Sequence, residues 1–240
     1  IINLKQGLVL VTGITGAGKS TTIASLIDRI SETRACRIIT IEDPIEYIYQ
    51  QKYSIISQRE IGKDVESFVT GLRSMMRQDP DIIFVGEMRD SETISMTLMA
   101  AETGHLVFST LHTRDVTGSI TRILDYFPSG RQGEVRNQLS LGLAYVICQK
   151  LVPKKDETGR IVAMEILNST NYACANLIRT GKVEQLYSQL QTKTRSGPDE
   201  KMMTMERHLA MLVKEDKIDL QEAQKWANDI KCFVDALKQD

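Results

Sequence analysis

The strongest chemical signal in the sequence is a phosphate-binding loop. Residues 13–20 read Gly-Ile-Thr-Gly-Ala-Gly-Lys-Ser and match the pattern G-x-x-x-x-G-K-[ST] at every position. Glycines allow backbone conformations that residues with a Cβ avoid, so successive backbone N–H groups can point at phosphate oxygens. The Lys19 ammonium would contact the β- and γ-phosphates, and the Ser20 hydroxyl would ligate Mg²⁺. We therefore predict a nucleoside triphosphate site that takes its nucleotide together with Mg²⁺. Its predicted binding residues are Gly13, Thr15, Gly16, Ala17, Gly18, Lys19, Ser20 and Thr21.

Acidic residues follow two apolar runs of the chain. Residues 82–85 are Ile-Ile-Phe-Val, and Gly86 and Glu87 come directly after them, which is the layout of a Walker B motif. A carboxylate at this place can polarise the water that attacks the γ-phosphate, or hold Mg²⁺ through its water shell. Glu87 is therefore the main predicted catalytic residue. The apolar run at 37–41 ends in an acidic segment, residues 42–46, whose carboxylates could ligate Mg²⁺ or orient water.

Two histidines bound a third apolar run, residues 105–113. His112 would lie at the carboxyl end of this predicted strand, which is the ligand side of a parallel sheet, and could sense the γ-phosphate there. His105 stands at the other end of the run. A histidine at a strand end can equally have a structural role, and both interpretations stay open for both residues. Two histidines without further ligands do not make a metal site.

Apolar patterns predict an alternation of strands and helices around these residues. The predicted strands are residues 7–12, 37–41, 53–58, 82–85 and 105–113. The predicted helices are residues 21–30, residues 64–78, and a segment that begins after an N-cap at Asp90 or Ser91 and ends near Glu102. Strands that alternate with helices indicate a parallel sheet, and such sheets bind ligands at the carboxyl ends of their strands. We predict an α/β fold, namely a RecA-like P-loop NTPase with a mainly parallel sheet between helices and a C-terminal helical subdomain.

The second half of the chain is predicted to be mainly helical. Helical periodicity covers residues 117–126 and 131–148, and residues 151–167 resemble a hairpin with a charged turn. Residues 192–200 read as a polar loop because they include Gly-Pro. Two helices are predicted in the tail, residues 201–240. We therefore divide the chain into an ATPase core at 1–190 and a C-terminal helical subdomain at 191–240.

Composition narrows the class of protein. The 240 residues are 42% hydrophobic and carry a net charge of −1, so they can bury a core and offer no general electrostatic case for nucleic acid or an anionic membrane. No apolar run reaches the roughly 20 residues that span a bilayer, so no direct membrane insertion is expected.

The chain opens at Ile1 almost directly on a core strand, and we expect that an N-terminal region precedes it. The four cysteines form no C-x-x-C pair, which argues against a zinc site or a disulfide framework. They are Cys36, Cys148, Cys174 and Cys232.

The order of these motifs resembles the secretion ATPase superfamily and, within it, the type IV pilus retraction ATPases. The resemblance covers roughly residues 5–225. In that family the matching segments are known as Walker A, Asp box, Walker B and His box. They correspond here to residues 13–20, 41–46 and 79–90, and to residues 101–105 with 110–113. The resemblance implies that Glu87 is the Walker B glutamate and that Glu46 is the Asp-box glutamate, with Glu42 as the nearby alternative. It also implies that His105 and His112 belong to the His box.

Further expectations come from the resemblance alone. It implies a cytoplasmic, homo-hexameric ring that hydrolyses ATP with Mg²⁺ and drives pilus retraction and twitching motility. Such a ring is peripheral to the inner membrane through the pilus machine. The implied partners are an inner-membrane pilus platform protein and a retraction paralogue. An N-terminal PAS-like domain, absent from this chain, and neighbouring subunits would complete the nucleotide site, in part through arginines.

One segment departs from the family pattern and keeps alternatives open. Retraction ATPases carry Ala-Ile-Arg-Asn-Leu-Ile-Arg-Glu, whereas residues 173–180 read Ala-Cys-Ala-Asn-Leu-Ile-Arg-Thr. One alternative is an accessory or regulatory nucleotide-binding paralogue that hydrolyses little by itself. Another is an assembly or secretion ATPase of the same superfamily, although the four-cysteine zinc insertion usual in those proteins has no counterpart here. A nucleic-acid motor would share the loop, but the chain lacks a basic tract or an aromatic stacking cluster.

Overall fold

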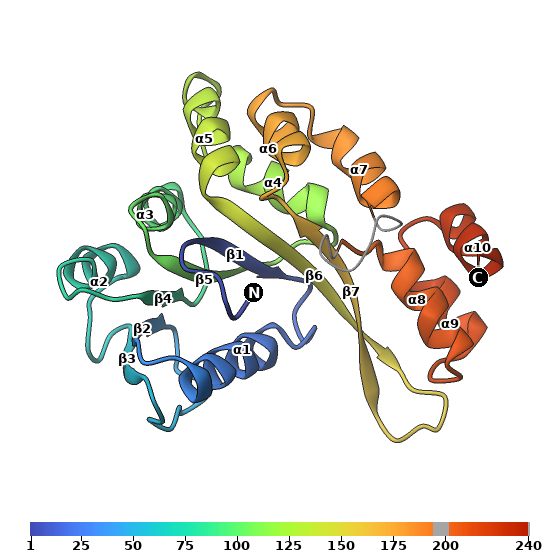
Figure 1. Ribbon diagram of the computed structural model, residues 1–240, viewed down its shortest axis with the longest axis horizontal. Helices are drawn as coiled ribbons and strands as arrows, with labels where there is room; N and C mark the ends of the chain where they lie inside the picture. The colour runs from blue at the N-terminus through green and yellow to red at the C-terminus, as the bar shows by residue number, and fades with distance from the viewer. Residues whose placement is uncertain (194–201, 240) are drawn as a thin grey trace.

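A seven-stranded sheet organises the computed structural model, which describes residues 1–193 and 202–239 (Figure 1). The strands lie in the order β3-β2-β4-β5-β1-β6-β7. Six of them are parallel, and only β7 runs antiparallel, against β6. The strand bounds are β1 Gly7–Thr12, β2 Arg37–Glu42, β3 Ile55–Glu60, β4 Ile82–Val85, β5 Leu106–Leu111, β6 Leu143–Pro153 and β7 Arg160–Asn168. The predicted α/β fold class with a mainly parallel sheet is confirmed.

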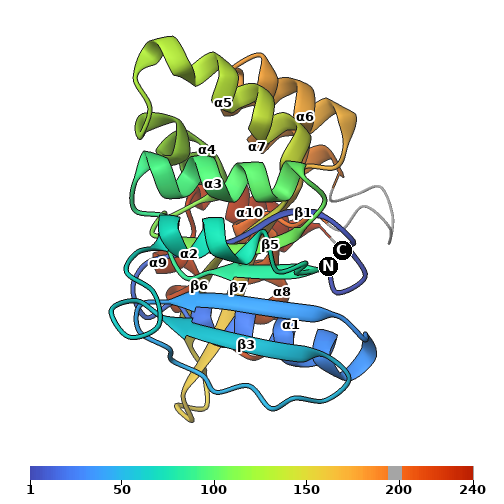
Figure 2. The same cartoon turned by 90° about the vertical axis from the view of Figure 1, so that its left-hand side faces the viewer.

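Helices cover both faces of this sheet. Helix α1 packs on one face, and helices α2 to α5 pack on the other (Figures 1 and 2). The remaining helices lie towards the β6–β7 end of the sheet (Figure 1). The helix bounds in the first group are α1 Lys19–Thr33, α2 Phe68–Met75, α3 Ser91–Glu102, α4 Val116–Asp125 and α5 Ser129–Gly142. The others are α6 Tyr172–Arg179, the 3₁₀ turn η1 Val183–Gln185, α7 Leu186–Lys193, α8 Met205–Lys214, α9 Leu220–Trp226 and α10 Ile230–Lys238.

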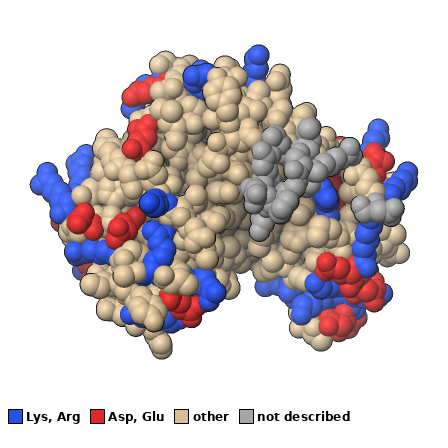
Figure 3. Space-filling model, in the orientation of Figure 1, with Lys and Arg blue, Asp and Glu red and all other residues tan. Residues whose placement is uncertain are grey.

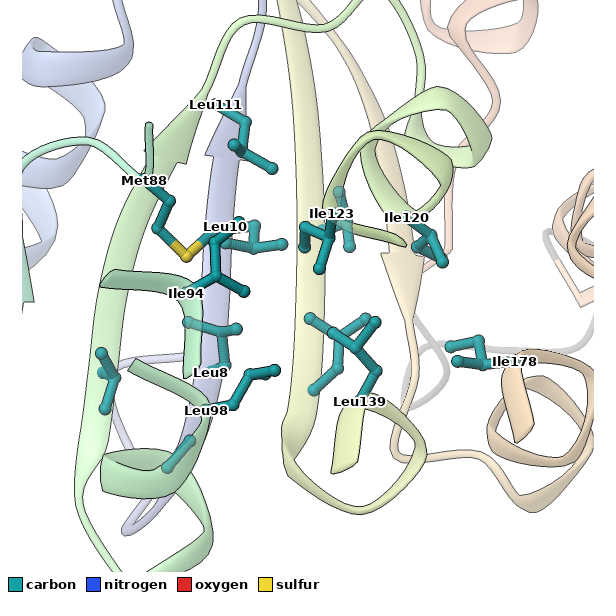
Figure 4. Packing of buried hydrophobic residues seen from close by; sticks show 14 of the residues in the cluster. Leu8, Leu10, Met88, Ile94, Leu98, Leu111, Ile120, Ile123, Leu139 and Ile178 are labelled. Carbon is teal, nitrogen blue, oxygen red and sulfur yellow. The ribbon is translucent and has the colours of Figure 1, made fainter. Parts of the chain in front are cut away.

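Strand β1 shows why the strands read as continuous apolar runs. Every residue from Gly7 to Thr12 is buried, because a parallel strand between two helical layers has no solvated face. Leu8 and Leu10 belong to the hydrophobic cluster that includes α3, and Figure 4 shows both side chains next to that helix. Val9 and Val11 point to the opposite face and pack with the buried side of α1. The alternation of side chains along one strand thus joins the two layers.

Residues 143–148 correct the predicted helix over 131–148. Helix α5 ends at Gly142, and the next residues begin β6. The segment Leu-Ala-Tyr-Val-Ile-Cys is apolar and rich in residues that favour strands, and it pairs in parallel with β1 on one side and antiparallel with β7 on the other. The first residues of this strand directly follow a helix and include no polar position that marks the change of period, so periodicity alone extended the predicted helix too far.

Other boundaries differ from prediction in smaller ways. Helix α2 is shorter than the predicted 64–78 because Ser67 caps it, with its side chain accepting the Thr70 N–H. The hairpin around the charged turn is confirmed as β6–β7. The tail holds three helices among the described residues, α8, α9 and α10, in place of two. Of the predicted loop at 192–200, the part from residue 194 lies outside the described residues.

The C-terminal helices α8 to α10 pack on the β6–β7 hairpin through their own hydrophobic cluster. Val152 and Ala163 contribute to it from the two strands, and Phe233 of α10 is completely buried there. Lys150 of β6 also reaches this group, because its Nζ donates to the Trp226 carbonyl at 2.8 Å and to Asn228 Oδ1 at 2.5 Å. The predicted division of the chain between residues 190 and 191 falls inside α7 and stays a prediction.

Asp90 caps α3 and offers a test of local stability. Its Oδ1 accepts the Thr93 N–H at 2.8 Å, and its Oδ2 accepts the Thr93 hydroxyl at 2.9 Å. We expect Asp90→Ala to lower the free energy of unfolding by about 1 kcal/mol, because an orphan donor of the first turn loses its partner. Asp219, the N-cap residue of α9, makes no such side-chain bond. Asp219→Ala should therefore change the free energy of unfolding by less than about 0.5 kcal/mol. Urea denaturation followed by circular dichroism measures both, and equal losses would contradict the capping argument.

Glu165 of β7 is expected to make the stability of the protein depend on pH. It is 1% exposed and accepts the Val116 N–H at the start of α4 at 3.2 Å. Burial raises the pKa of its carboxyl to about 8, above the value of an unfolded chain. The native state therefore keeps a proton that the unfolded state loses, so the free energy of unfolding should fall as pH rises towards 8, by about 1 kcal/mol per pH unit.

Glu165→Gln should remove this slope, because the amide keeps the shape and the acceptor oxygen without a charge. Glu184→Gln, at an exposed position of η1, is the matched control and should keep the native slope. Urea titrations at pH 5.5, 6.5 and 7.5 provide the comparison. A Glu165→Gln slope equal to that of the native protein would show that this carboxyl does not carry the effect.

Charges on the surface are mixed in sign. In Figure 3, Lys and Arg side chains lie next to Asp and Glu side chains, mainly towards the edges of the face shown. Among the residues that the structure describes, no helix is long and apolar enough to cross a bilayer.

Candidate functional site

A cleft of about 440 Å³ opens where the parallel strands β1, β2, β4 and β5 end. Loops leave neighbouring strands in different directions at this edge of an open sheet, so ligands commonly bind there. The loop after β1 forms one wall, the acidic segment after β2 and the residues after β4 and β5 form the opposite side, and the β6–β7 hairpin adds Leu151 and Arg160. The cleft thus collects side chains from widely separated places in the sequence.

The loop at residues 13–18 is shaped by its glycines. Gly13, Gly16 and Gly18 have φ angles of 148°, 77° and 83°, a region that L-residues rarely adopt. At Gly13 there is also no room, since a Cβ would lie 2.5 Å from the Gln149 carbonyl oxygen. The Ala17 N–H donates to the Ile14 carbonyl at 3.1 Å and closes the loop.

Helix α1 begins at this loop without a side-chain cap. Gly18 is its N-cap, and Thr22 N–H donates to the Gly18 carbonyl. The first N–H groups of a helix have no partner inside the helix and lie at the positive end of its dipole. The N–H groups of Lys19, Ser20 and Thr21 are therefore suited to an anion in the cleft. Open glycine turns, free helical donors and one ammonium group together fit a polyphosphate.

Lys19 extends into this cradle and is 9% exposed. Its Nζ donates to the Gly13 carbonyl at 3.0 Å and to the Ile14 carbonyl at 3.3 Å, and lies 3.4 Å from His112 Nδ1. Burial lowers the pKa of the ammonium, while the charges of Glu87 and Glu46 raise it.

Glu87 lies at the centre of a network of charged groups. Its Oε2 accepts from Arg89 Nε at 2.7 Å, and its Oε1 lies 3.3 Å from His112 Nε2. Arg89 also reaches Asp43 Oδ2 at 3.5 Å. Because an ammonium can only donate, His112 Nδ1 must accept from Lys19, which leaves the ring proton on Nε2, facing Glu87. His112 thus links the lysine of the loop to the carboxylate.

The two glutamates of the acidic segment differ in their environment. Glu42 is 5% exposed and accepts from the Thr40 hydroxyl at 2.7 Å and from Gln58 Nε2 at 3.2 Å. Burial raises the pKa of its carboxyl. Glu46 lines the cleft from an exposed loop. The next residue, Tyr47, joins this segment to the loop, since its hydroxyl is 2.7 Å from Thr21 Oγ1.

His105 is the one predicted site residue that lies at the opposite edge of the sheet. Its Nδ1 is 3.0 Å from the Ala100 carbonyl oxygen, which can only accept, and 3.2 Å from the Thr103 hydroxyl. Its own carbonyl accepts the Gly7 N–H at 3.0 Å, at the start of β1. Of the other predicted residues, all but Gly13 line the cleft, and Gly13 holds Lys19 through its carbonyl.

Several residues around the cleft were missed by sequence reasoning. Arg89 stands two positions after Glu87, and this proximity was a usable signal. Tyr47 and Tyr49 lie in or beside the acidic segment and line the cleft together with it. Arg160 lines the cleft from β7, and Gln149 contacts the loop from β6. These last two had no local signal, because they reach the site only through the pairing of the hairpin with β1.

Known proteins are similar to this chain over almost its whole length. The chain matches the family model "Type II/IV secretion system protein" over residues 1–235. It is 49% identical over 224 residues to the twitching motility protein of Neisseria gonorrhoeae, an alignment that covers 93% of this chain and 59% of that protein. It is 47% identical over 227 residues to the type IV pilus retraction ATPase PilT of Pseudomonas aeruginosa, covering 95% of this chain and 64% of that one.

A solved structure, that of the pilus retraction motor PilT with bound ADP, superposes with a TM-score of 0.87 at 50% identity. The superposition covers 96% of this chain and 64% of that one. The chain therefore spans between 59% and 64% of the length of these three relatives.

Proposed function

The chain belongs to the family of type II/IV secretion system proteins, and we propose that it is the ATP-hydrolysing part of a type IV pilus retraction motor. The carrying observation is the cleft itself, where a complete phosphate-binding loop faces Glu87 across the carboxyl ends of four parallel strands. The names of the two relatives at 49% and 47% identity support retraction and twitching motility, and the ADP bound to the similar PilT structure supports a nucleotide in this cleft.

The loop would bind the phosphates of ATP or ADP. Its backbone N–H groups and the start of α1 supply fixed donors, and Lys19 supplies a charge that turns from the Gly13 and Ile14 carbonyls to the phosphates. The Ser20 hydroxyl would ligate Mg²⁺, and the Glu87 carboxylate would face the water shell of the ion. When bound, Mg²⁺ would neutralise charge on the phosphate oxygens.

Glu87 would orient and polarise the attacking water. Arg89 holds one of its oxygens and His112 contacts the other, so the carboxylate is positioned before substrate arrives. Glu46, on the facing wall, would help to place the water. The buried Glu42 would support that wall through its bonds to Thr40 and Gln58.

His112 would report the arrival of phosphate to Glu87. As Lys19 turns to the phosphates, His112 Nδ1 loses its donor, and the contact of the ring with Glu87 can change in response. His105 cannot act in this way from its place beside Ala100. A functional role for His105 in ATP hydrolysis stays a prediction.

The working assembly would be larger than this chain. We propose a homo-hexameric ring on the cytoplasmic side of the inner membrane, with an N-terminal PAS-like domain, the ATPase core at 1–190 and the helical subdomain at 191–240. Neighbouring subunits would complete each cleft. The platform protein of the pilus machine and a retraction paralogue would be its partners.

Helix α6 supports one alternative, an accessory paralogue with little turnover of its own. Together with its C-cap Thr180 it forms the departing segment, residues 173–180, which lacks the first arginine and the final glutamate of the family pattern. Ala175 and Thr180 stand at these two positions, and neither is buried. A surface without these charges would suit a subunit that depends on another motor.

Steady-state ATP hydrolysis by the full-length protein tests the proposal, with EDTA as the control for Mg²⁺ and light scattering for the mass. Mg²⁺-dependent turnover at the mass of a hexamer is the expected result. ADP binding without turnover, with activity restored only by a paralogue, would favour the accessory subunit. Absence of nucleotide binding would overturn both.

A further inference from the structure

Gln149 of β6 lies beside the phosphate-binding loop although it is far from it in sequence. Strand β6 runs parallel to β1 and pairs Cys148 with Thr12, the last residue of β1. Gln149 is the next residue along β6, so it stands next to the chain where β1 gives way to the loop. Its side chain is enclosed there, with 1% of the residue exposed.

Both ends of the Gln149 amide are used by the loop and the helix behind it. Nε2 donates to the Ala17 carbonyl at 2.6 Å, and Oε1 accepts from the Thr22 hydroxyl at 3.0 Å. The orientation of the amide follows from the chemistry, because a carbonyl can only accept and must face the NH₂ group. One side chain therefore ties the end of the loop and the first turn of α1 to the sheet.

The bond to Ala17 has a geometric consequence for the next residue. In a planar trans peptide, the carbonyl of one residue and the N–H of the following residue point in opposite directions. With the Ala17 carbonyl held towards Gln149, the Gly18 N–H must point away from β6. Gly18 is the N-cap of α1 and lines the cleft, so its N–H is one of the donors at the positive end of the helix.

Strand β6 also limits the space at both ends of the loop. The Gln149 carbonyl oxygen is 2.5 Å from the place of a Cβ at Gly13, and its Nε2 is 3.3 Å from that place at Gly18. The loop is thus held from the β6 side by close contact and by directed hydrogen bonds.

We infer that Gln149 is a positioning residue, which sets the orientation of the Ala17–Gly18 peptide and thereby the affinity of the loop for nucleotide phosphates. This inference rests on the proposed nucleotide site. It adds a residue outside the sequence motifs that controls the affinity of this site for nucleotide. Gln149 touches no phosphate itself. It acts through the peptide that it holds.

The test compares Gln149→Met with the native full-length protein by titration with ADP. Methionine has a similar length but no hydrogen-bonding amide, so we expect the affinity for ADP to fall about tenfold or more. Thr22→Val removes only the second bond, leaves Nε2 on Ala17, and should change the affinity less than about threefold. Unfolding without nucleotide is followed in parallel to show that each variant is folded.

Gln149→Glu separates a positioning role from mere filling of space. An ionised carboxylate has no proton to give the Ala17 carbonyl, whereas a protonated carboxyl can both donate to it and accept from Thr22. Burial favours the protonated form. At pH 5.5 the Glu variant should therefore bind ADP more tightly than the Met variant, with both values taken relative to the native protein at that pH.

The outcomes separate the two claims. Native binding of ADP together with equal affinity in Gln149→Met would overturn the role of Gln149 and leave the proposed function standing. Glu and Met variants of equal affinity at pH 5.5 would overturn it as well. If the Met variant fails to fold, the Glu variant is compared with the native protein at several pH values. The affinity of the Glu variant for ADP must then rise relative to the native protein as pH falls, and a constant ratio would overturn the role of Gln149. Absence of ADP binding by the native protein would overturn the proposed function and this inference with it.

Discussion

Replacing Glu87 by glutamine is expected to lower the rate of ATP hydrolysis at least about 100-fold, while ADP binds within about threefold of the native affinity. General-base catalysis commonly contributes a factor of this size, and an amide cannot take up the proton of the attacking water. Glutamine keeps the volume of the side chain and an oxygen for the Arg89 bond at Oε2. Binding depends on the loop, which the substitution does not touch.

Glu92→Gln is the matched control for this experiment. Glu92 lies five residues further on, on the exposed first turn of α3, where it pairs with Arg73 at 3.2 Å. The same change of charge at that position should leave hydrolysis unchanged. Turnover is measured by phosphate release at saturating ATP, and binding by titration with ADP. Native turnover in Glu87→Gln would show that another group, with Glu46 as the first candidate, activates the water.

The second-largest effect is expected for Gly13→Ala. This substitution should lower the free energy of unfolding by about 3 kcal/mol or more and remove most of the affinity for ADP. Two causes act together at this position. A backbone φ of 148° is strained for alanine, and the added Cβ would stand 2.5 Å from the Gln149 carbonyl and 2.9 Å from the Ala17 Cβ. Neither β6 nor the loop can yield without moving the donors that would face the phosphates.

Gly62→Ala isolates the first cause from the second. Gly62 has a φ of 81°, and a Cβ there would meet nothing within 4 Å, so only the conformational strain of about 1–2 kcal/mol applies. Chemical denaturation of both variants gives the difference. If Gly13→Ala loses no more than Gly62→Ala and still binds ADP, then the packing of β6 against the loop is not what restricts this position.

The parts of the fold that the sequence predicts well are those whose signals are local. The loop at 13–20, the strand before it and the helix after it are contiguous, so one motif with its flanks defined all three. Glu87 and His112 were found because each follows directly on a buried strand, and the carboxyl ends of parallel strands meet at one edge. His105 was grouped with them by family resemblance, although it precedes its strand and therefore lies at the other edge.

The parts that were missed depend on pairing between distant segments. Residues 143–148 carry the same apolar pattern whether they extend α5 or begin β6, and only the neighbouring strands β1 and β7 decide between the two. Gln149 has no significance in the sequence because its partner Ala17 is 132 positions away. Arg160 is one of many charged residues near a turn until the hairpin carries it to the cleft.

The bond from Lys150 to the carbonyl of Trp226 has an experimental consequence. Trp226 is the only tryptophan in the chain, and it lines a cavity of about 440 Å³ together with Ile14 of the phosphate-binding loop. Its indole emission therefore has a single origin, within reach of the loop and tied to the residue that follows Gln149. Stopped-flow fluorescence is therefore a direct way to test whether this single emission changes when unlabelled nucleotide binds to the loop.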